Sequence, residues 1–469
     1  MTSAFNLAAI AAAAGLASVV PAAAQTALPE LAAASSGASI VPAAGTAAPA
    51  ARVFNTITVT GNSRFSARDV IATSGLQAGT VMGQQDLQAA VDALQYTAEF
   101  ERVVITSAGD TLNIEVEETA GYSGGLTFGA GYDTDRGLFG AAGITLDGAL
   151  GAGTTASLNL SYSEPVQTLR FDLRSPQFWP GEIAGGLRGG YENFQYSDVT
   201  YNFSRASIEP YLALDLGGTA ALELRYTLSM ADIYNVDAGA SPIIAAEAGR
   251  EVSSGIGFSL GSSSAKFGSG AGVFDRWSVR FDQDITGLGG DTKTSTSQLT
   301  LSARAPIAQS GFALRTRIEA GAVVGFGGDA PRASDRFSLG GSRLRGFARG
   351  AVAPIDVCAG CGAGGADQNT VLGGNTFVAA RTDLLVPLFR DRPEIETFVF
   401  FDIGSAWGLD TGTAPAGTLH DGLSWRSSAG LGVSFDTPLG SFEAFYAPYA
   451  DGLATDAKQE FGLTLRADF

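Results

Sequence analysis

The chain has 469 residues, of which 16% are charged and 45% are hydrophobic, and its formal net charge at pH 7 is −18. This charge excludes nucleic acid as an expected partner, because phosphate binding needs a basic face. The length allows two or three ordinary domains, or one large barrel with a small domain, and hydrophobic periodicity has to decide between them.

The first residues predict an export signal followed by a linker. Residues 7–20 form an apolar, Ala-rich core, and Ala22-Ala23-Ala24 is a small-residue cleavage site, so 1–24 is predicted to be a signal peptide. The absence of Lys and Arg before Arg52 departs from the usual pattern. Residues 25–51 are mostly Ala, Pro, Ser and Gly and predict a disordered linker. No later segment has the roughly 18 consecutive apolar residues of a spanning helix, so we expect a periplasmic protein or an outer-membrane barrel.

Residues 52–118 predict a small α+β domain. Ser66 can cap a first helix that ends at Ser74, and apolar residues at helical spacing predict a second helix over 84–96. Strands are predicted where apolar and polar residues alternate, at 54–59, 102–106 and 112–116.

Residues 119–469 predict a transmembrane β-barrel. Apolar and polar residues alternate with period two and give sixteen candidate strands, at the roughly 22 residues per strand that suit transmembrane strands with their turns. Because hydrocarbon leaves no backbone amide unpaired, such strands must close into a ring with a lipid-facing outside and a wet inside. The predicted fold class is mainly β: a sixteen-stranded antiparallel transmembrane β-barrel preceded by one small α+β domain. The last strand shows the alternation most clearly, with Phe461, Leu463, Leu465, Ala467 and Phe469 on one face.

The longest segment without alternation is 327–371, and loops of this length are functional or disordered. It carries the Gly-rich, basic stretch that ends in Leu344-Arg345-Gly346-Phe347. We predict that it folds into the barrel lumen. Asp402 lies on the inward face of a predicted strand, and a guanidinium binds a carboxylate through two hydrogen bonds, so Arg345 and Asp402 are predicted partners. Exchanging the two charges is then expected to rescue the loss of either one in part.

The same segment contains the two cysteines, Cys358 and Cys361. A zinc site would need more ligands than His420, the one histidine of the chain, can supply. In an oxidising compartment a local disulfide is the better interpretation. We expect no metal and no cofactor.

Three stretches of the chain resemble parts of two known protein families. Residues 52–118 resemble a polypeptide-transport-associated (POTRA) domain, in the I-x-V-x-G-N pattern that begins at Ile57, in an L-x-x-G turn at Leu76, and in the segment with Leu94, Thr97, Phe100 and Val103. Leu344-Arg345-Gly346-Phe347 resembles the (V/I)-R-G-(F/Y) loop of the outer-membrane insertase and transporter superfamily that includes BamA, TamA and the two-partner-secretion transporters. Phe401-Asp402-x-Gly404-x-x-Trp407 is similar to its F-x-D-x-G-x-x-W strand.

The resemblance implies a lock in the lumen, made by Arg345, Gly346 and Phe347 of the loop with Asp402 of the wall. The alternative is that this pairing only stabilises the barrel. The chain carries one POTRA-like segment where these relatives carry several, so the resemblance leaves the subfamily open.

The resemblance also implies a function in outer-membrane protein assembly, with the POTRA domain in the periplasm. Clients, which are unfolded outer-membrane or secreted polypeptides, would add to an exposed edge strand within 101–106 or 111–117. The first of these contains Arg102, Val103, Val104 and Ile105. Expected partners also include outer-membrane lipids, and a periplasmic or lipoprotein partner remains open.

The seam between the first and last barrel strands is expected to open sideways for the client. Glycine weakens a strand, so Gly124, Gly125 and Gly129 would loosen this seam, which ends at Phe469. The alternative is that these glycines only accommodate curvature.

Two other functions compete with this hypothesis. Gly121-Tyr122-Ser123-Gly124-Gly125 matches the G-x-S-x-G motif of hydrolases, but it opens a predicted strand far in sequence from His420, so we expect no enzyme. A passive porin would need neither the POTRA-like segment nor the long loop. The sequence does not distinguish insertion of clients into the membrane from their secretion across it.

Overall fold

The computed structural model describes residues 52–62, 65–96, 100–118, 123–148, 154–179, 183–196, 199–217, 219–263, 276–307, 310–361, 363–389, 391–392, 394–437 and 440–468. The predicted signal peptide, the predicted linker and Phe469 lie outside these residues. No helix within them is long and apolar enough to cross a bilayer.

The small N-terminal domain has two helices against a sheet. Its first helix begins where the sequence predicts, because the Ser66 hydroxyl accepts a hydrogen bond from the Asp69 N–H at 3.1 Å, and it ends at Gly75 with φ 72°. In chain order the elements are β1 (Arg52–Val53), β2 (Thr56–Thr60), α1 (Ala67–Ser74), β3 (Val81–Met82), α2 (Gln84–Tyr96), β4 (Phe100–Ala108) and β5 (Thr111–Glu118).

The sheet of this domain has the order β2-β5-β4 among the described residues, with β2 parallel and β4 antiparallel to β5. Of the two segments considered for the exposed edge, 111–117 is therefore wrong, because it forms the central strand. The edge strand β4 contains Arg102, which is exposed, but the side chains of Val103, Val104 and Ile105 are buried. A client could therefore pair with the backbone N–H and C=O groups of β4 that face away from β5.

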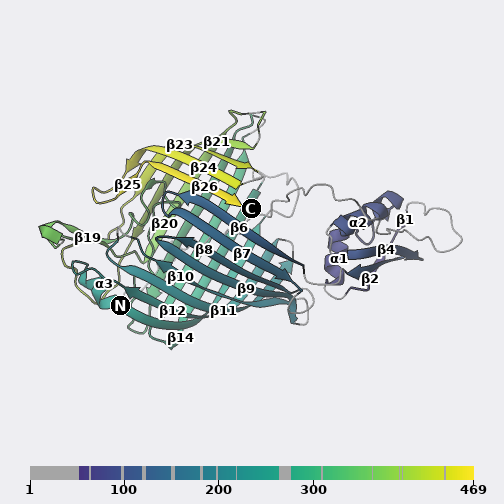
Figure 1. The fold of residues 1–469 in the computed structure, drawn as a ribbon, viewed down its shortest axis with the longest axis horizontal. Helices are drawn as coiled ribbons and strands as arrows, with labels where there is room; N and C mark the ends of the chain where they lie inside the picture. The colour runs from purple at the N-terminus through teal and green to yellow at the C-terminus, as the bar shows by residue number, and fades with distance from the viewer. Residues whose placement is uncertain are drawn as a thin grey trace, which may run out of the picture.

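In the part of the chain that the structure describes, sixteen antiparallel strands form a closed barrel (Figure 1). The sixteen-stranded barrel predicted from the alternation is confirmed. Its strands are β6 (Ser123–Asp133), β7 (Gly137–Asp147), β8 (Thr155–Ser163), β9 (Val166–Trp179), β10 (Ile183–Phe194), β11 (Asn202–Gly217), β12 (Ala220–Tyr234), β13 (Gly249–Ser263), β14 (Arg276–Gly290), β15 (Thr294–Pro306), β16 (Ala313–Gly325), β20 (Thr376–Val386), β21 (Ile395–Trp407), β23 (Arg426–Thr437), β24 (Gly440–Asp451) and β26 (Phe461–Asp468).

The two ends of the barrel differ in their connections. We call the end at which β6 begins the near end and the opposite one the far end. Because successive strands alternate in direction, the connections β12–β13, β16–β20, β21–β23 and β24–β26 all lie at the far end. They hold α3 (Pro242–Glu247), β17 (Gly346–Phe347), β18 (Ile355–Cys358), the 3₁₀ turn η1 (Ala363–Gly365), β19 (Gln368–Val371), β22 (Thr418–His420) and β25 (Lys458–Gln459).

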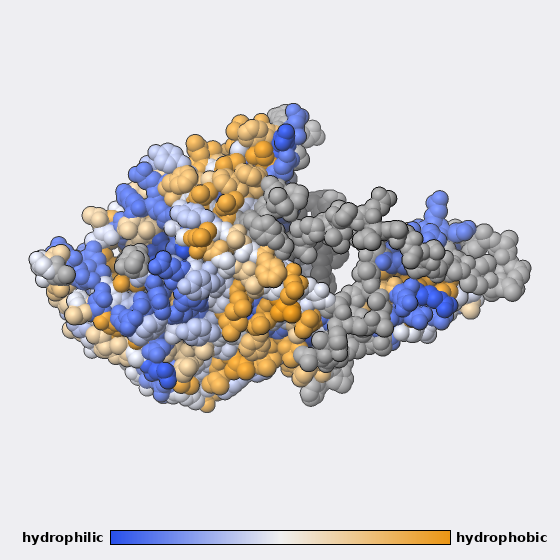
Figure 2. All heavy atoms as spheres, viewed as in Figure 1, coloured by the Kyte–Doolittle hydropathy of each residue, from blue (hydrophilic) through white to orange (hydrophobic). Residues whose placement is uncertain are grey.

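The strands carry apolar side chains outward and polar ones inward. On β12, Leu224, Tyr226 and Leu228 are 41–45% exposed, whereas the side chain of Arg225 between them is 8% exposed. Figure 2 shows hydrophobic residues spread over the outer wall and hydrophilic residues gathered toward the far end. This is the pattern of a wall that meets lipid on its outer face.

Ion pairs brace the inner face of the wall across intervening strands. Arg225 on β12 bonds both oxygens of Asp284 on β14, at 2.9 and 2.6 Å. The ion pair crosses over β13, the strand between them, at Gly257. A Cβ at this position would lie 2.1 Å from Asp284 Oδ1. Arg188 on β10 similarly reaches Glu223 on β12 at 2.6 Å.

We expect Leu228→Arg to destabilise the barrel by about 2–4 kcal/mol, because a lipid-facing cation near the bilayer midplane must leave water. The matched variant is Thr227→Arg, whose side chain would point into the wet lumen. The check is a urea titration of each protein in lipid vesicles, followed by its heat-modifiable mobility. Equal effects of the two variants would contradict the assignment of the faces.

Candidate functional site

The β16–β20 loop, residues 326–375, packs against the inner side of the barrel wall. Its residues Leu339, Leu344, Phe347 and Val352 are almost completely buried. They form a cluster with Phe377 and Ala379 of β20 and Ala406 of β21. The outward side chains of β21, such as Val399, are exposed instead, so the loop lies on the lumen side of this strand.

Arg345 is held by two carboxylates inside the barrel. Its Nε and Nη2 donate to Oδ2 and Oδ1 of Asp402 at 2.8 and 2.7 Å, and its backbone N–H donates to Oδ2 at 3.2 Å. Nη2 also donates to Oδ1 of Asp383 at 2.6 Å. Arg345 is 1% exposed and Asp402 is 0% exposed. The structure therefore brings together the two residues that the sequence paired, in a two-pronged, charge-assisted arrangement.

Aromatic rings complete the surroundings of this cation. The guanidinium carbon of Arg345 lies 3.9 Å from the ring centroid of Phe400 and 5.5 Å from that of Phe398. Both rings belong to the inward face of β21, and a cation over an aromatic face is attracted to it. Burial alone lowers the pKa of Arg345, but its hydrogen bonds to Asp402 and the charges of Asp402 and Asp383 raise that pKa above its ordinary value. Arg345 therefore stays a cation in the lumen.

The two residues after Arg345 have steric reasons to be Gly and Phe. Gly346 has φ 86°, and a Cβ there would lie 2.8 Å from Cβ of Ser428 on β23. The Ser428 hydroxyl donates to the carbonyl oxygen of Arg345 at 2.5 Å. Phe347 is 0% exposed and fills the cluster next to the wall. We call Arg345, Gly346, Phe347 and Asp402 the loop lock.

Asp383 is the member of the site that the sequence reasoning missed. The burial pattern of β20 places Phe377, Ala379 and Asp383 at alternate positions on the inward face. A carboxylate in register with inward apolar residues is a signal that could have found it. Its presence also changes an expectation: after exchange of Arg345 and Asp402, a carboxylate at position 345 would face Asp383. The rescue by charge exchange should therefore be weaker than for an isolated pair.

We expect Arg345→Ala to lower the free energy of unfolding by about 3–5 kcal/mol, because Asp402 loses the cation that hydrogen-bonds both of its oxygens, and less where lumen water reaches this carboxylate. Asp383 keeps its hydrogen bond from Arg315 at 3.0 Å. The measurement is a urea titration in vesicles, read by heat-modifiable mobility. Arg392→Ala is the control, since that side chain is 70% exposed at a near-end connection. If both variants unfold at the same urea concentration as the wild type, the ion pairs of Arg345 do not stabilise the barrel.

The seam between β26 and β6 is short. Among the described residues it has five pairs, from Thr464↔Asp133 to Asp468↔Gly129, whereas β6 pairs with β7 through eleven. Gly129 thus lies in the seam. Gly124 and Gly125 do not: they pair with Leu146 and Thr145 of β7 beyond the last seam pair, so the prediction that they loosen the seam is corrected. Phe469, also predicted to be a seam residue, is outside the described residues.

Comparison with known proteins identifies the family. The sequence profile described as the Omp85 superfamily domain matches residues 149–465. The chain belongs to the Omp85 superfamily. The closed barrel and this membership place it in the bacterial outer membrane.

Relatives of this Omp85 protein agree with the assignment. It is 24% identical over 340 residues to the outer membrane protein assembly factor BamA of Neorickettsia risticii, covering 71% of this chain and 43% of the relative. It is 25% identical over 420 residues to BamA of Nitratidesulfovibrio vulgaris, covering 87% of this chain and 50% of the relative. The chain spans about half the length of these curated relatives.

A solved structure supports the fold of this Omp85 protein. The crystal structure of Haemophilus ducreyi BamA lacking POTRA domains 1–3 matches with a TM-score of 0.69 at 22% identity, covering 89% of this chain and 85% of that one.

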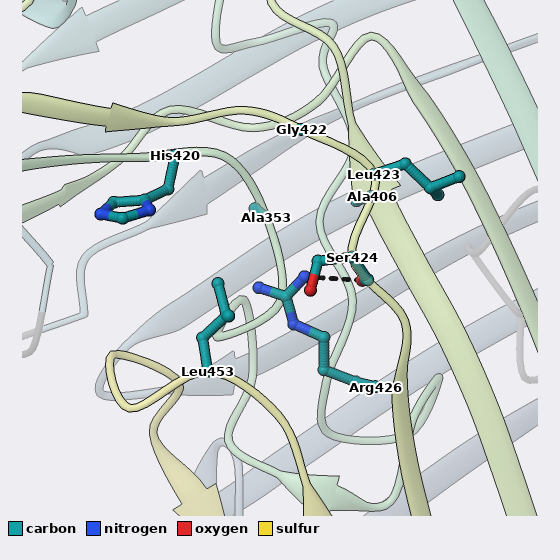
Figure 3. Close-up of a pocket in the computed structure, with 8 residues that line it drawn as sticks. All are labelled: Ala353, Ala406, His420, Gly422, Leu423, Ser424, Arg426 and Leu453. Carbon is teal, nitrogen blue, oxygen red and sulfur yellow. Dashed lines mark hydrogen bonds between the residues drawn. The ribbon is translucent and has the colours of Figure 1, made fainter.

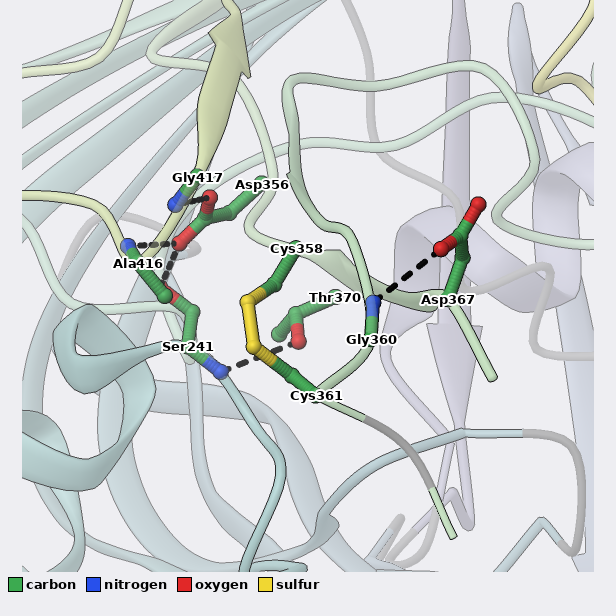
Figure 4. Close-up of a disulfide and its surroundings, with 9 residues drawn as sticks. All are labelled: Ser241, Asp356, Cys358, Gly360, Cys361, Asp367, Thr370, Ala416 and Gly417. Atoms are coloured by element: carbon green, nitrogen blue, oxygen red, sulfur yellow. Dashed lines mark hydrogen bonds between the residues drawn. A yellow bond between two sulfur atoms is a disulfide. The ribbon is translucent and has the colours of Figure 1, made fainter. Parts of the chain in front are cut away.

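A buried carboxylate joins three far-end loops of this Omp85 protein (Figure 4). Asp356 on β18 is 1% exposed and accepts from the Ser241 hydroxyl at 2.6 Å and from the N–H groups of Ala416 and Gly417 at 2.7 and 3.0 Å. The neighbouring Cys358 is bonded to Cys361 in a disulfide, as Figure 4 shows.

We expect Asp356→Asn to loosen these loops, because an amide cannot serve all three donors, and each buried donor left unpaired costs about 1–3 kcal/mol. Hydrogen exchange at Ala416 and Gly417 should become faster. Asp410→Asn is the control, since Asp410 is exposed in the same β21–β23 connection. Unchanged exchange at both amides would contradict the role of Asp356.

Beside these loops, Arg426 at the start of β23 forms a second buried ion pair. Its Nε and Nη2 donate to the two oxygens of Asp456 at 2.8 and 3.0 Å, and its Nη1 donates to the Ser424 carbonyl at 2.7 Å. A pocket of about 200 Å³ lies next to it (Figure 3). Every guanidinium nitrogen of Arg426 is engaged within the protein, so this residue offers the pocket no free charge. The pocket is lined by Ala353, Ala406, His420, Gly422, Leu423, Ser424, Arg426 and Leu453.

The residues considered for catalysis are not assembled. Ser123 opens β6 at the near end, whereas His420 lies in β22 at the far end. Among the described residues, no group of His, Cys, Asp and Glu could hold a metal ion.

Proposed function

We propose that this chain is an outer-membrane protein assembly factor that inserts client β-barrels through the seam between β6 and β26. The observation that carries the proposal is the loop lock. Arg345 is buried against Asp402 and Asp383 inside a closed barrel whose seam has few backbone pairs. A pore for passive diffusion needs neither this motif-bearing loop nor the POTRA-like domain, so their combination favours assembly.

The proposal that clients enter at the seam is based on the difference in length between β6 and β26, which leaves part of β6 unpaired among the described residues. On the seam side, Ser123–Phe128 of β6 have no partner in the described part of β26. A strand edge without a neighbour can accept an extended client segment by main-chain hydrogen bonds. A client paired in this way would enter the bilayer with its backbone amides satisfied, which hydrocarbon requires.

Client capture in the periplasm is assigned to the N-terminal domain as a POTRA domain. Its edge strand β4 has one described neighbour, β5, so its outer backbone groups can pair with an extended client. Recognition by the backbone makes little demand on client sequence. Outer-membrane lipids surround the barrel, and a periplasmic or lipoprotein partner would extend the short recruiting surface. This function involves no enzymatic step.

The proposal is tested by comparing outer-membrane and secreted proteomes of cells with and without the protein. We expect several other barrel proteins to fall severalfold, and Arg345→Ala to reproduce part of that loss because the lock is needed during client insertion. Arg392→Ala serves as the control. Deletion of 52–118 should lower the same proteins by removing client capture.

Other outcomes would assign another function. Loss of one exported protein with normal barrel levels would indicate secretion through the lumen. A large, steady, solute-selective conductance that survives deletion of 52–118 would indicate a porin, and either result would overturn insertion.

A further inference from the structure

The tip of the β16–β20 loop, residues 340–349, touches the connection that leads into the last barrel strand. Gly346 and Phe347 pair with Gln459 and Lys458 as the small antiparallel sheet β17–β25. The N–H of Ala348 donates to the carbonyl of Ala457 at 2.8 Å. Backbone pairing thus joins the loop tip to residues 452–460, immediately before β26.

This connection is itself anchored to the same part of the wall. Asp456 is bound by Arg426 of β23 and accepts the N–H of Leu453 at 2.7 Å. Gly452 packs so closely that a Cβ there would lie 2.6 Å from Asp456 Oδ2 and 2.9 Å from the ring of Phe347. The connection, β23 and the loop tip therefore form one packed unit.

The loop tip also meets the other edge of the seam, at the β6–β7 turn. Asp135 lies against Gly341, where a Cβ would be 2.3 Å from its Oδ2. Burial raises the pKa of Asp135, the charge of Asp133 adds to this, and Arg349 and Arg136 oppose it. The N–H of Thr134 in the same turn donates to Leu463 of β26 at 3.1 Å, so this contact lies at the far end of the seam.

The two attachments differ greatly in strength. Arg345 and Ser428 bind the loop to β20, β21 and β23, the three strands that precede β24 and β26 in the ring. Buried ion pairs of this kind are costly to break, and three backbone contacts are added to them. On the β6 side the loop rests against a partly buried carboxylate in a turn, where ionic contacts contribute little.

We propose that residues 340–349 form a clasp across the far end of the seam. The clasp stays with β26 and releases the β6–β7 hairpin at Asp135 when the seam opens. The role of the clasp rests on the proposed function, because sideways opening is the step it controls. Asp135 is then a positioning residue that sets how often the seam is open.

Distances between spin labels in vesicles test the clasp without any client. Cysteines replace Thr134 in the β6–β7 turn, Ser342 in the clasp and Ala454 in the connection before β26, two at a time, in a Cys358→Ser/Cys361→Ser background. All three positions are exposed. In Asp135→Lys, which sets a cation beside Arg136 and Arg349, we expect the fraction of long 134–342 distances to rise about threefold. The 342–454 distance should stay unchanged.

The controls separate the clasp from a general effect of charge. Asp410→Lys makes the same charge change in an exposed far-end loop and should leave both distances as in the wild type. Heat-modifiable mobility checks that each labelled protein has folded, and Asp135→Asn, which removes only the charge, replaces Asp135→Lys if that variant does not fold. A longer 342–454 distance, or an unchanged 134–342 distance, would overturn the proposal.

Failure of the clasp and failure of the proposed function give different results. If the 134–342 distance responds but cells lacking the protein keep normal levels of other barrel proteins, the clasp stands and the assembly function falls. If barrel levels fall but the distance does not respond, the assembly function stands without the clasp.

Discussion

The need to pair every backbone amide in hydrocarbon is the constraint on which this structure depends. It forces the strands into a ring, and the ring fixes which side chains meet lipid and which meet water. The constraint is met least completely between β6 and β26, where the described residues form five pairs. The pairing between β6 and β26 is therefore weaker than the pairing between the other neighbouring strands of the ring. It is weak at this place because the last strand, β26, is short and pairs with only part of β6.

The loop inside the ring compensates for this weakness at the far end. Its attachment is ionic and buried: Arg345 binds Asp402 and Asp383 while lying over the ring of Phe400. Hydrophobic packing alone could hold a loop against the wall, but it would not fix its orientation. Two carboxylates and one guanidinium do so, because their hydrogen bonds are directional. The backbone pairing β17–β25 then places the loop tip beside the last strand.

The local parts of this architecture could be predicted from the sequence. The helix cap at Ser66 and the sixteen alternating strands depend on residues close together in sequence. Both could therefore be predicted from local sequence patterns. Arg345 and Asp402 could be matched because an arginine in a long loop and an inward carboxylate suit each other and because both lie in motifs that resemble those of one family. Asp383 and the β17–β25 pairing were missed because they depend on how distant segments pack. The register of β26, which excludes Gly124 and Gly125 from the seam, is likewise set by the closure of the whole ring.

The ion pairs that cross intervening strands make the wall mechanically uneven. Arg225 reaches Asp284 over Gly257, and Arg188 reaches Glu223, so this arc of the barrel is cross-braced and resists shear between its strands. A load on such a cylinder deforms its most compliant sector first. Stiffness on the β10–β14 arc would therefore direct any distortion by lipid or client toward the opposite side of the ring, where β26 meets β6. The braced arc then acts as a frame and the junction of β26 with β6 as its hinge.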